Sequence, residues 1–148
     1  MTRDWNLPLT YPPKIEPVRK GECTQTIRFC TISKSKKHPG EIIRKQVGDR
    51  VRFYRWSGRP YWSHPECITD YMELWMAEDI CITPTGFLFY HNGKFQREYN
   101  WNYWEMKRLA ECDFIDPPTG EALRDVLIKK NGKIPAEGVP AQILRWNP

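Results

Sequence analysis

Apolar and polar residues alternate along most of this chain, a pattern that is typical of β-strands. The stretches with a period of two are rich in Val, Ile, Thr and aromatic residues, and they predict strands over residues 7–11, 23–32, 50–56, 72–83, 87–91, 94–98 and 141–146. Residues 72–83 are either one central strand or a bent strand pair. The dipeptide Asn92-Gly93 separates two of them and is the preferred pair of a type I′ turn, so it predicts a β-hairpin.

Helical spacing is found near the N-terminus, in residues 13–20. Ile15 and Val18 lie three residues apart and would share one face of a helix. Pro17 lacks the amide hydrogen that a helix interior needs, so this helix must be short. Gly21 then suits the left-handed position that ends many helices.

Two further helices are predicted before the last strand. Asn102 is a candidate N-cap with Glu105 three residues later, and Thr119 is a candidate N-cap of a helix from Gly120 to Lys130. The element order is then a short helix, several strands, two helices and a closing strand. It lacks the strand–helix alternation that builds a parallel sheet. We therefore expect an α+β fold, a small mixed β-barrel with helices over its openings.

Composition agrees with a single domain that spans residues 1–148, because 40% of the residues are hydrophobic and can form one core. No apolar run approaches the roughly 18 residues that cross a membrane. The five cysteines form no C-x-x-C pair, and the ligand-like fragment His64-Pro-Glu-Cys67 lacks a partner fragment. We expect a cytoplasmic protein with reduced thiols, no cofactor, no metal centre and no membrane partner.

The formal net charge of +5 favours a polyanionic partner, nucleic acid first. Between residues 50 and 62, basic and aromatic residues interleave, so bases could stack on rings while guanidinium groups hold phosphates. The candidates for this surface are Arg52, Arg55, Trp56, Arg59 and Trp62. The alternative is a strand whose aromatic residues are core and whose arginines are solvated.

The stretch KGECTQTIR, residues 20–28, holds further binding candidates. In a regular strand, a period of two places Cys23 on the core face with Ile27. The opposite face is then a polar row of Thr24, Thr26 and Arg28. Hydroxyl groups can bond a base edge or a phosphate, and a guanidinium pairs with phosphate through two parallel bonds. Alternatively, the threonines are simply strand formers, and Arg28 pairs with Asp113 or Glu111.

Residues 21–28 resemble the G-x-K-T-x-T-x-R signature of the ASCH domain family. Four more segments are similar to family elements in the same order, namely VGDRV at 47–51, LAECDF at 109–114, the helix at 121–130 and ILRW at 143–146. The resemblance covers about residues 9–147. It implies a PUA-like β-barrel with a cleft beside the signature strand. It also implies binding of RNA, single-stranded nucleic acid, a modified base or a nucleotide.

One bacterial branch of the family removes the acetyl group from N(4)-acetylcytidine with a lysine, a threonine and a glutamate. Carried over by motif, these positions fall on Cys23, Thr26 and Asp113. Lys20 is a candidate replacement for the motif lysine. Cys23 is either a nucleophile, if a cation stabilises its thiolate, or a small core residue. Three functions stay open: nucleic-acid or nucleotide binding, amide hydrolysis on an acylated cytosine, and protein interaction.

Overall fold

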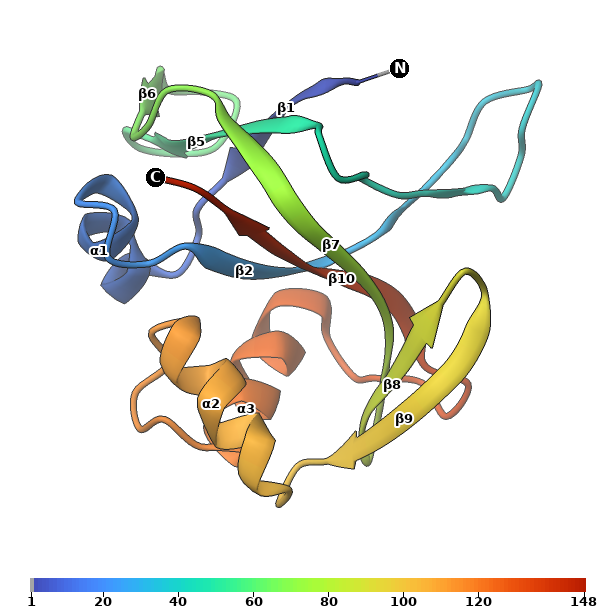
Figure 1. Cartoon of the computed structure of the whole chain (residues 1–148). Coiled ribbons are helices and arrows are strands. Elements are labelled where there is room, and N and C mark those ends of the chain that lie inside the picture. The colour runs from blue at the N-terminus through green and yellow to red at the C-terminus, as the bar shows by residue number, and fades with distance from the viewer. Residues whose placement is uncertain (1) are drawn as a thin grey trace.

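The sheet is built around one long strand, β7 (Met72–Thr83). The computed structural model describes residues 2–148. In it, β7 pairs with three strands, which are β5 (Arg50–Trp56), β8 (Gly86–His91) and β10 (Val139–Trp146). The outer strands are β1 (Asp4–Pro8) and β6 (Pro65–Cys67) beside β5, β9 (Lys94–Asn100) beside β8, and β2 (Gln25–Phe29) beside β10. Together they form a curved, eight-stranded mixed sheet (Figure 1).

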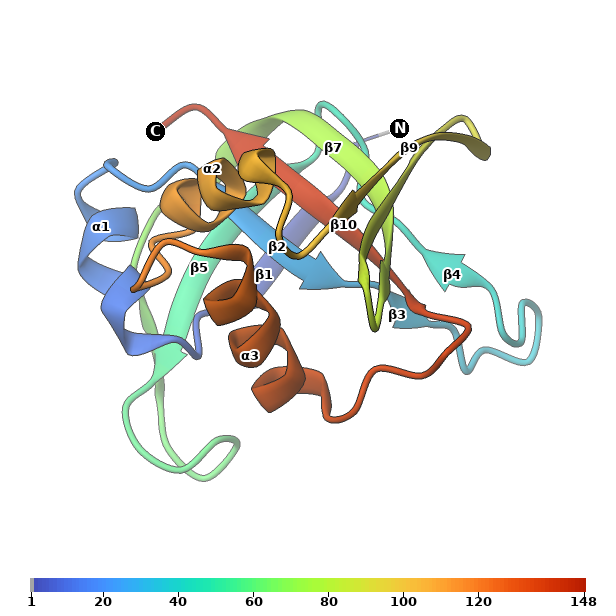
Figure 2. The same ribbon diagram turned by 90° about the horizontal axis from the view of Figure 1, so that it is seen from below.

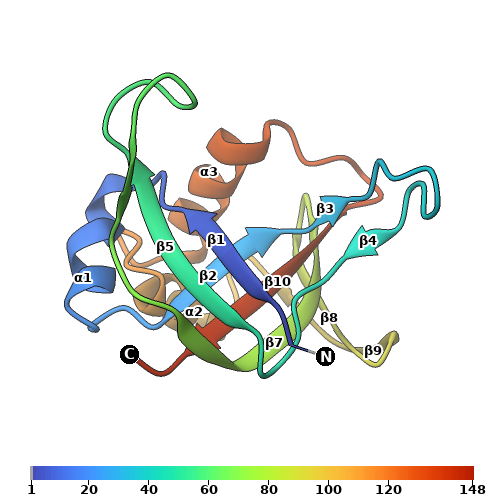
Figure 3. The same cartoon turned by 90° about the horizontal axis from the view of Figure 1, so that it is seen from above.

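The hydrogen-bonded path through the sheet runs β1-β5-β7-β10-β2. Within residues 2–148 no ladder joins β1 to β2, so backbone pairing does not close the sheet. A separate ribbon of β3 (Thr31–Ile32) and β4 (Ile42–Ile43) extends beyond the end of β2 (Figure 3). Strands and helices therefore occur in one mixed arrangement, and the predicted α+β class is confirmed.

Three short helices complete the fold, and their order is the predicted one. They are α1 (Ile15–Arg19), which follows the 3₁₀ turn η1 (Pro12–Lys14), then α2 (Trp104–Cys112) and α3 (Gly120–Asn131). Helices α2 and α3 lie together against one face of the sheet (Figures 1 and 2). None of the helices in the described part of the chain is long and apolar enough to cross a membrane.

The helix starts test two predicted caps. The Thr119 side chain accepts a hydrogen bond from the Ala122 amide at 3.1 Å, as predicted. The Asn102 cap was wrong, because α2 begins one residue later than expected. Its N-cap is Tyr103, which has an extended backbone and makes no side-chain cap bond.

Two hydrophobic cores lie on opposite sides of β2 and β10. The helix-side core joins α2 and α3 to the sheet through residues such as Ile27, Leu123 and Ile143. The N-terminal core joins α1, β1 and β5 through residues such as Phe53 and Leu144. Neighbours along β10 thus point into different cores, as the pleat requires.

The first predicted strands had inexact limits. The strand expected over 23–32 divides, because Gln25–Phe29 pairs with β10 whereas Thr31–Ile32 pairs with β4. The strand expected over 7–11 is instead Asp4–Pro8, since Pro12 starts the 3₁₀ turn soon afterwards. The predicted strands over 50–56 and 72–83 match β5 and β7 residue for residue.

The turn Gly48-Asp49 fixes β1 against β5. The Asp49 carboxylate accepts hydrogen bonds from Trp5 Nε1 at 2.9 Å and from the amides of Arg3 and Gln46, each at 3.0 Å. Burial opposes ionisation, but these bonds outweigh it and hold the pKa of the Asp49 carboxyl below its ordinary value. The strand that carries the basic and aromatic residues is therefore anchored at its start.

Candidate functional site

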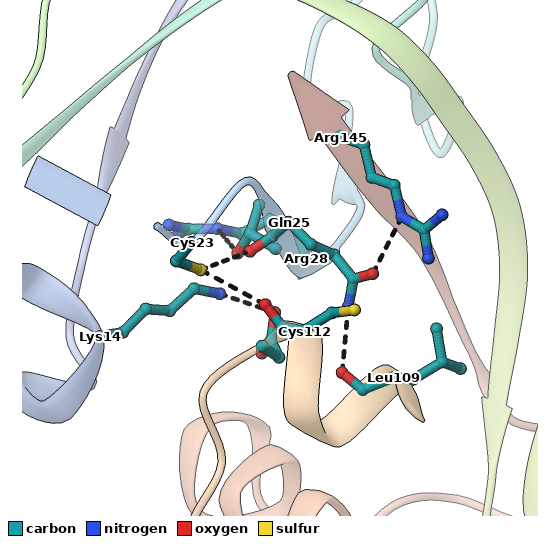
Figure 4. Close-up of polar contacts among 9 residues, drawn as sticks. Lys14, Cys23, Gln25, Arg28, Leu109, Cys112 and Arg145 are labelled. Atoms are coloured by element: carbon teal, nitrogen blue, oxygen red, sulfur yellow. Dashed lines mark hydrogen bonds and ion pairs between the residues drawn. The ribbon is translucent and has the colours of Figure 1, made fainter. Parts of the chain in front are cut away.

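Lys14 is the residue around which the site forms. It ends η1 and is only 1% exposed. Its Nζ lies 2.7 Å from Oδ1 of Asp113, which is itself buried. Figure 4 shows the Lys14 side chain extending toward Cys112 at the end of α2. A buried ammonium is costly unless it has a charged partner, so this ion pair explains why a lysine can lie inside the molecule.

Asp113 directly follows α2, and the chain turns sharply after it. Phe114 has a φ of 56°, a left-handed conformation that side chains rarely adopt. The amide of Phe114 donates to the Glu111 carbonyl, and the amide of Ile115 donates to the Ala110 carbonyl, each at 3.0 Å. The end of α2 is thus held in a defined turn, which presents the Asp113 carboxylate to the interior.

Cys23 lies on the same side of the sheet as Thr26, and the prediction of opposite faces was wrong. Cys23 belongs to the N-terminal core, and Thr26 pairs in register with Leu144 of that core. The period of two fails because β2 begins only at Gln25. The Cys23 Sγ donates to the carbonyls of Gln25 and Cys112, each at 3.4 Å. Burial raises the pKa of this thiol, which disfavours the thiolate that a nucleophile requires.

Thr26 and Arg28 share a face of β2, as predicted. The Arg28 Nε donates to Thr26 Oγ1 at 3.3 Å, and the guanidinium carbon lies 5.8 Å from the centre of the Phe53 ring. No ion pair in the described part of the chain includes Arg28, because Lys14 already occupies the nearby carboxylate of Asp113. Desolvation lowers the pKa of Arg28 to about 10, so its positive charge remains at neutral pH without an acidic partner.

A cavity of about 620 Å³ lies between the segment before η1 and the C-terminal half of α3. Its lining residues are Thr10, Tyr11, Pro12, Asp125, Val126, Lys129 and Lys130. Although much of the Lys130 side chain is exposed, desolvation and then the charges of Arg28 and Lys14 lower its pKa to about 8. Thr26 and Asp113 do not line this cavity, so the space lies next to the signature strand and not on it.

Lys14, Thr26, Arg28, Asp113 and Lys130, together with this cavity, are called the basic cleft below. Lys14, Arg28, Lys130 and the lining residue Lys129 bring four positive charges. Asp113 and the lining residue Asp125 bring two negative charges, which leaves two positive charges in excess. Partly desolvated cations attract anions more strongly than cations in open water, because the effective dielectric constant is lower. The chemistry for which this arrangement is suited is therefore the binding of an anionic group.

Two other residues from the signature stretch lie apart from the cleft. Lys20 is exposed at the C-terminal end of α1, and Lys14, not Lys20, places an ammonium beside Asp113. Thr24 precedes β2 and is half-buried, and its carbonyl accepts from the Trp146 amide at 3.2 Å. The sequence thus located Thr26, Arg28 and Asp113 but not the lysine that joins them.

The outer-surface candidates form two groups: Arg52, Arg55 and Trp56 lie on β5 itself, and Arg59 and Trp62 lie in the connection after it. Arg52 and Trp56 line a shallow cavity of about 250 Å³ on the strand itself. Arg55 forms an ion pair with Glu66 at 3.0 Å, which occupies its charge. Arg52 and Trp56 therefore remain accessible, whereas Arg55 is engaged across the strand pair.

The connection from β5 to β6 projects beyond the sheet (Figure 3). Trp62 is 79% exposed and Tyr61 88% exposed, so neither ring is core. The guanidinium carbon of Arg59 lies 5.1 Å from the Trp62 ring centre, and the rings of Trp56 and Tyr61 are also 5.1 Å apart. We call Trp56, Arg59, Tyr61 and Trp62 the aromatic tip.

Sequence patterns did not identify Lys14, Tyr11 or Lys130 as site residues. No local signal marks them, because Lys14 meets Asp113 only through packing across the interior. Comparisons with known proteins do not add candidates, because no protein-family model, no curated protein and no solved structure matches the chain. The side chains of this chain are therefore the basis on which its function is inferred.

Breaking the buried ion pair should destabilise the fold. Lys14→Met leaves the Asp113 carboxylate buried without a partner, and we expect the free energy of unfolding to fall by roughly 3–5 kcal/mol. The double variant Lys14→Met/Asp113→Leu removes both charges and should recover most of that loss. Urea unfolding followed by tryptophan fluorescence measures both.

The matched control for this prediction is Arg19→Gln. Arg19 forms an exposed pair with Glu16, and such pairs contribute about 1 kcal/mol or less. A double variant as unstable as Lys14→Met alone would contradict the electrostatic explanation and point to lost packing.

Proposed function

We propose that the chain is a nucleic-acid or nucleotide-binding domain whose basic cleft holds a phosphate beside Arg28 and a base in its cavity. One observation carries this proposal: Arg28 is a partly desolvated guanidinium without an acidic partner, because Asp113 pairs with Lys14. A planar guanidinium is well suited to bidentate phosphate binding. Thr26 fixes the orientation of Arg28 through its hydroxyl.

The cavity has a suitable size and lining for a base. Its volume of about 620 Å³ lies within the range of roughly 300–1,000 Å³ that small-molecule sites occupy. Tyr11 offers a ring for stacking, and Pro12 and Val126 offer apolar surface. Lys130 then provides a cation where the phosphate would lie.

The aromatic tip supports binding of a strand in preference to a single nucleotide. The Leu9 amide donates to the Tyr54 carbonyl at 2.9 Å. Residue 9 therefore lies beside the C-terminal end of β5, from which the aromatic tip extends, and the cavity residue Tyr11 follows two positions later. Exposed rings such as Tyr61 and Trp62 accept stacked bases without regard to sequence. RNA or another single-stranded nucleic acid is thus the proposed partner.

The ASCH-like, PUA-like barrel remains part of this proposal. The resemblance rests on the motif order, and a curved sheet covered by α2 and α3 at one face is consistent with it. Asp113 and Thr26, two residues that the motif selects, both lie in the basic cleft.

An amidohydrolase is the second candidate, and the position of Lys14 favours it. The resemblance implies a lysine beside the acid, and Lys14 supplies an ammonium to Asp113 from outside the motif. Under the binding proposal, incubation with N(4)-acetylcytidine yields no cytidine by chromatography. Cytidine formed by the wild type and lost in Thr26→Ala would instead make the chain an enzyme.

Removal of the Arg28 charge should weaken RNA binding. We expect Arg28→Gln to lower the affinity for a short labelled single-stranded RNA about tenfold or more at about 50 mM salt. The slope of log affinity against log salt should fall by about 0.7, the value for one lost phosphate contact on a single strand. Fluorescence anisotropy over a salt series measures both quantities.

Arg19→Gln removes the same charge from an exposed position on α1 and serves as the control. Equal affinities for the two variants would refute the role of Arg28. Trp62→Ala distinguishes base stacking at the aromatic tip from the phosphate contact of Arg28. Loss of one stacked base should cost about 1–3 kcal/mol of binding free energy and leave the salt slope unchanged.

The pH dependence of binding should report Lys130. Because its pKa is about 8, Lys130 is charged at lower pH and becomes neutral as the pH rises through that value. RNA affinity should therefore fall between about pH 7 and about pH 9. Lys130→Arg keeps its charge throughout this pH range and should remove the dependence. Lys130→Gln should bind RNA weakly at both the lower and the higher pH. A wild-type affinity that does not change over this range would contradict the assignment.

A further inference from the structure

A second cavity, of about 340 Å³, is lined by Leu109 and Arg145, the two residues that the Gln25 side chain bonds. Three arginines from three different elements line it: Arg97 of β9, Arg108 of α2 and Arg145 of β10. In Figure 4, Lys14 and Arg145 approach Gln25 from opposite sides. This cavity is not part of the basic cleft, and none of its lining residues was a candidate from the sequence.

Arg145 is positioned by a neutral partner. Its Nε donates to Gln25 Oε1 at 3.0 Å, while Gln25 Nε2 donates to the Leu109 carbonyl at 3.1 Å. Gln25 is only 1% exposed, so this linkage is rigidly packed. Within residues 2–148 the terminal nitrogens of Arg145 make no hydrogen bond to protein, and no described residue forms an ion pair with this guanidinium, whose carbon lies 6.0 Å from the centre of the Trp75 ring.

The acidic groups near the cavity are largely occupied. Arg97 pairs with Glu78 at 2.8 Å and donates to the Tyr99 hydroxyl at 3.0 Å. The Tyr99 hydroxyl in turn donates to Glu105. The three arginines are thus set against two carboxylates, Glu105 in the lining and Glu78 paired with Arg97, which leaves one positive charge in excess.

Arg108 supplies the second unengaged guanidinium. It lies on the exposed face of α2, and within residues 2–148 it makes no side-chain hydrogen bond to protein and no ion pair. Together with Arg145, it gives the cavity two guanidinium groups whose terminal nitrogens lack protein acceptors in the described part of the chain. Two such forks at one small cavity match the several oxygen atoms of a phosphoryl group.

We propose that this cavity is a second anion site, which binds a phosphoryl group between Arg108 and Arg145. The guanidinium of Arg145, oriented by Gln25, provides geometry, and the exposed side chain of Arg108 supplies the second cation. The phosphoryl group belongs either to a free monophosphate or to a phosphodiester of a strand. The inference does not depend on the basic cleft, because the two sites share no charged residue.

Titrations with adenosine monophosphate and with a single-stranded RNA that lacks terminal phosphates distinguish the two sources. Arg145→Gln and Arg108→Gln should each lower the affinity for the phosphoryl probe about tenfold. Arg19→Gln is the charge-matched control and should bind like the wild type. If the variants lose affinity for the monophosphate alone, the site binds a phosphate monoester. If they lose affinity for the RNA, it binds a phosphodiester.

Arg108 is exposed, so its variant tests the site even if Arg145→Gln disturbs the packing of Gln25. Arg28→Gln keeps this second site intact, and failure of the basic cleft would leave the effects of Arg108→Gln and Arg145→Gln unchanged. Nuclear magnetic resonance of the arginine Nε–H groups gives a direct readout, since the Arg145 signal should shift on addition of the probe. The proposal is overturned if both variants bind both probes as tightly as Arg19→Gln does.

Discussion

The buried ion pair between Lys14 and Asp113 is the interaction on which the site depends. It joins a 3₁₀ turn near the N-terminus to the end of α2, although the two residues lie 99 positions apart. A buried charge must be paired, so the folded state requires contact between this turn and the end of α2. Since the Asp113 carboxylate is then occupied, Arg28 keeps a net positive charge inside the molecule, and the excess positive charge of the basic cleft follows from this pair.

Local sequence signals were sufficient for much of the fold. Strands β5 and β7 and the hairpin at Asn92-Gly93 follow from periodicity and turn chemistry, which act between neighbouring residues. The Thr119 cap could be recognised because an N-cap bond spans only three residues. The Asn102 cap failed because an extended Tyr103 starts α2 without a side-chain bond, and nothing in the composition of that segment distinguishes the two starts.

The site was predictable only in part, because long-range packing decides it. Thr26 and Arg28 were found because both lie within the regular part of β2, where a period of two holds. Cys23 was misplaced because it lies just outside that strand. Lys14 has no local signal as a partner of Asp113, since ion pairing across the interior depends on where α2 ends in space. A closed barrel would also require a ladder between β1 and β2, which are distant in the sheet order. In the described residues these two strands are not paired, and local sequence patterns could not indicate this.

Strand β2 lies between two sites of positive charge, and the residue types along it explain how both can coexist. Thr26 and Arg28 face the basic cleft, while the Gln25 side chain bonds Arg145 at the second cavity. A carboxylate at position 25 would also bond Arg145, but it would cancel the charge that makes the guanidinium useful. The buried neutral amide of Gln25 instead accepts from Arg145 and donates to the Leu109 carbonyl of α2. It therefore fixes the position of Arg145 without neutralising its charge. Pairing Lys14 with Asp113 leaves Arg28 unpaired, and holding Arg145 with the neutral Gln25 leaves its charge uncancelled, so both arrangements place a net positive charge near the protein core.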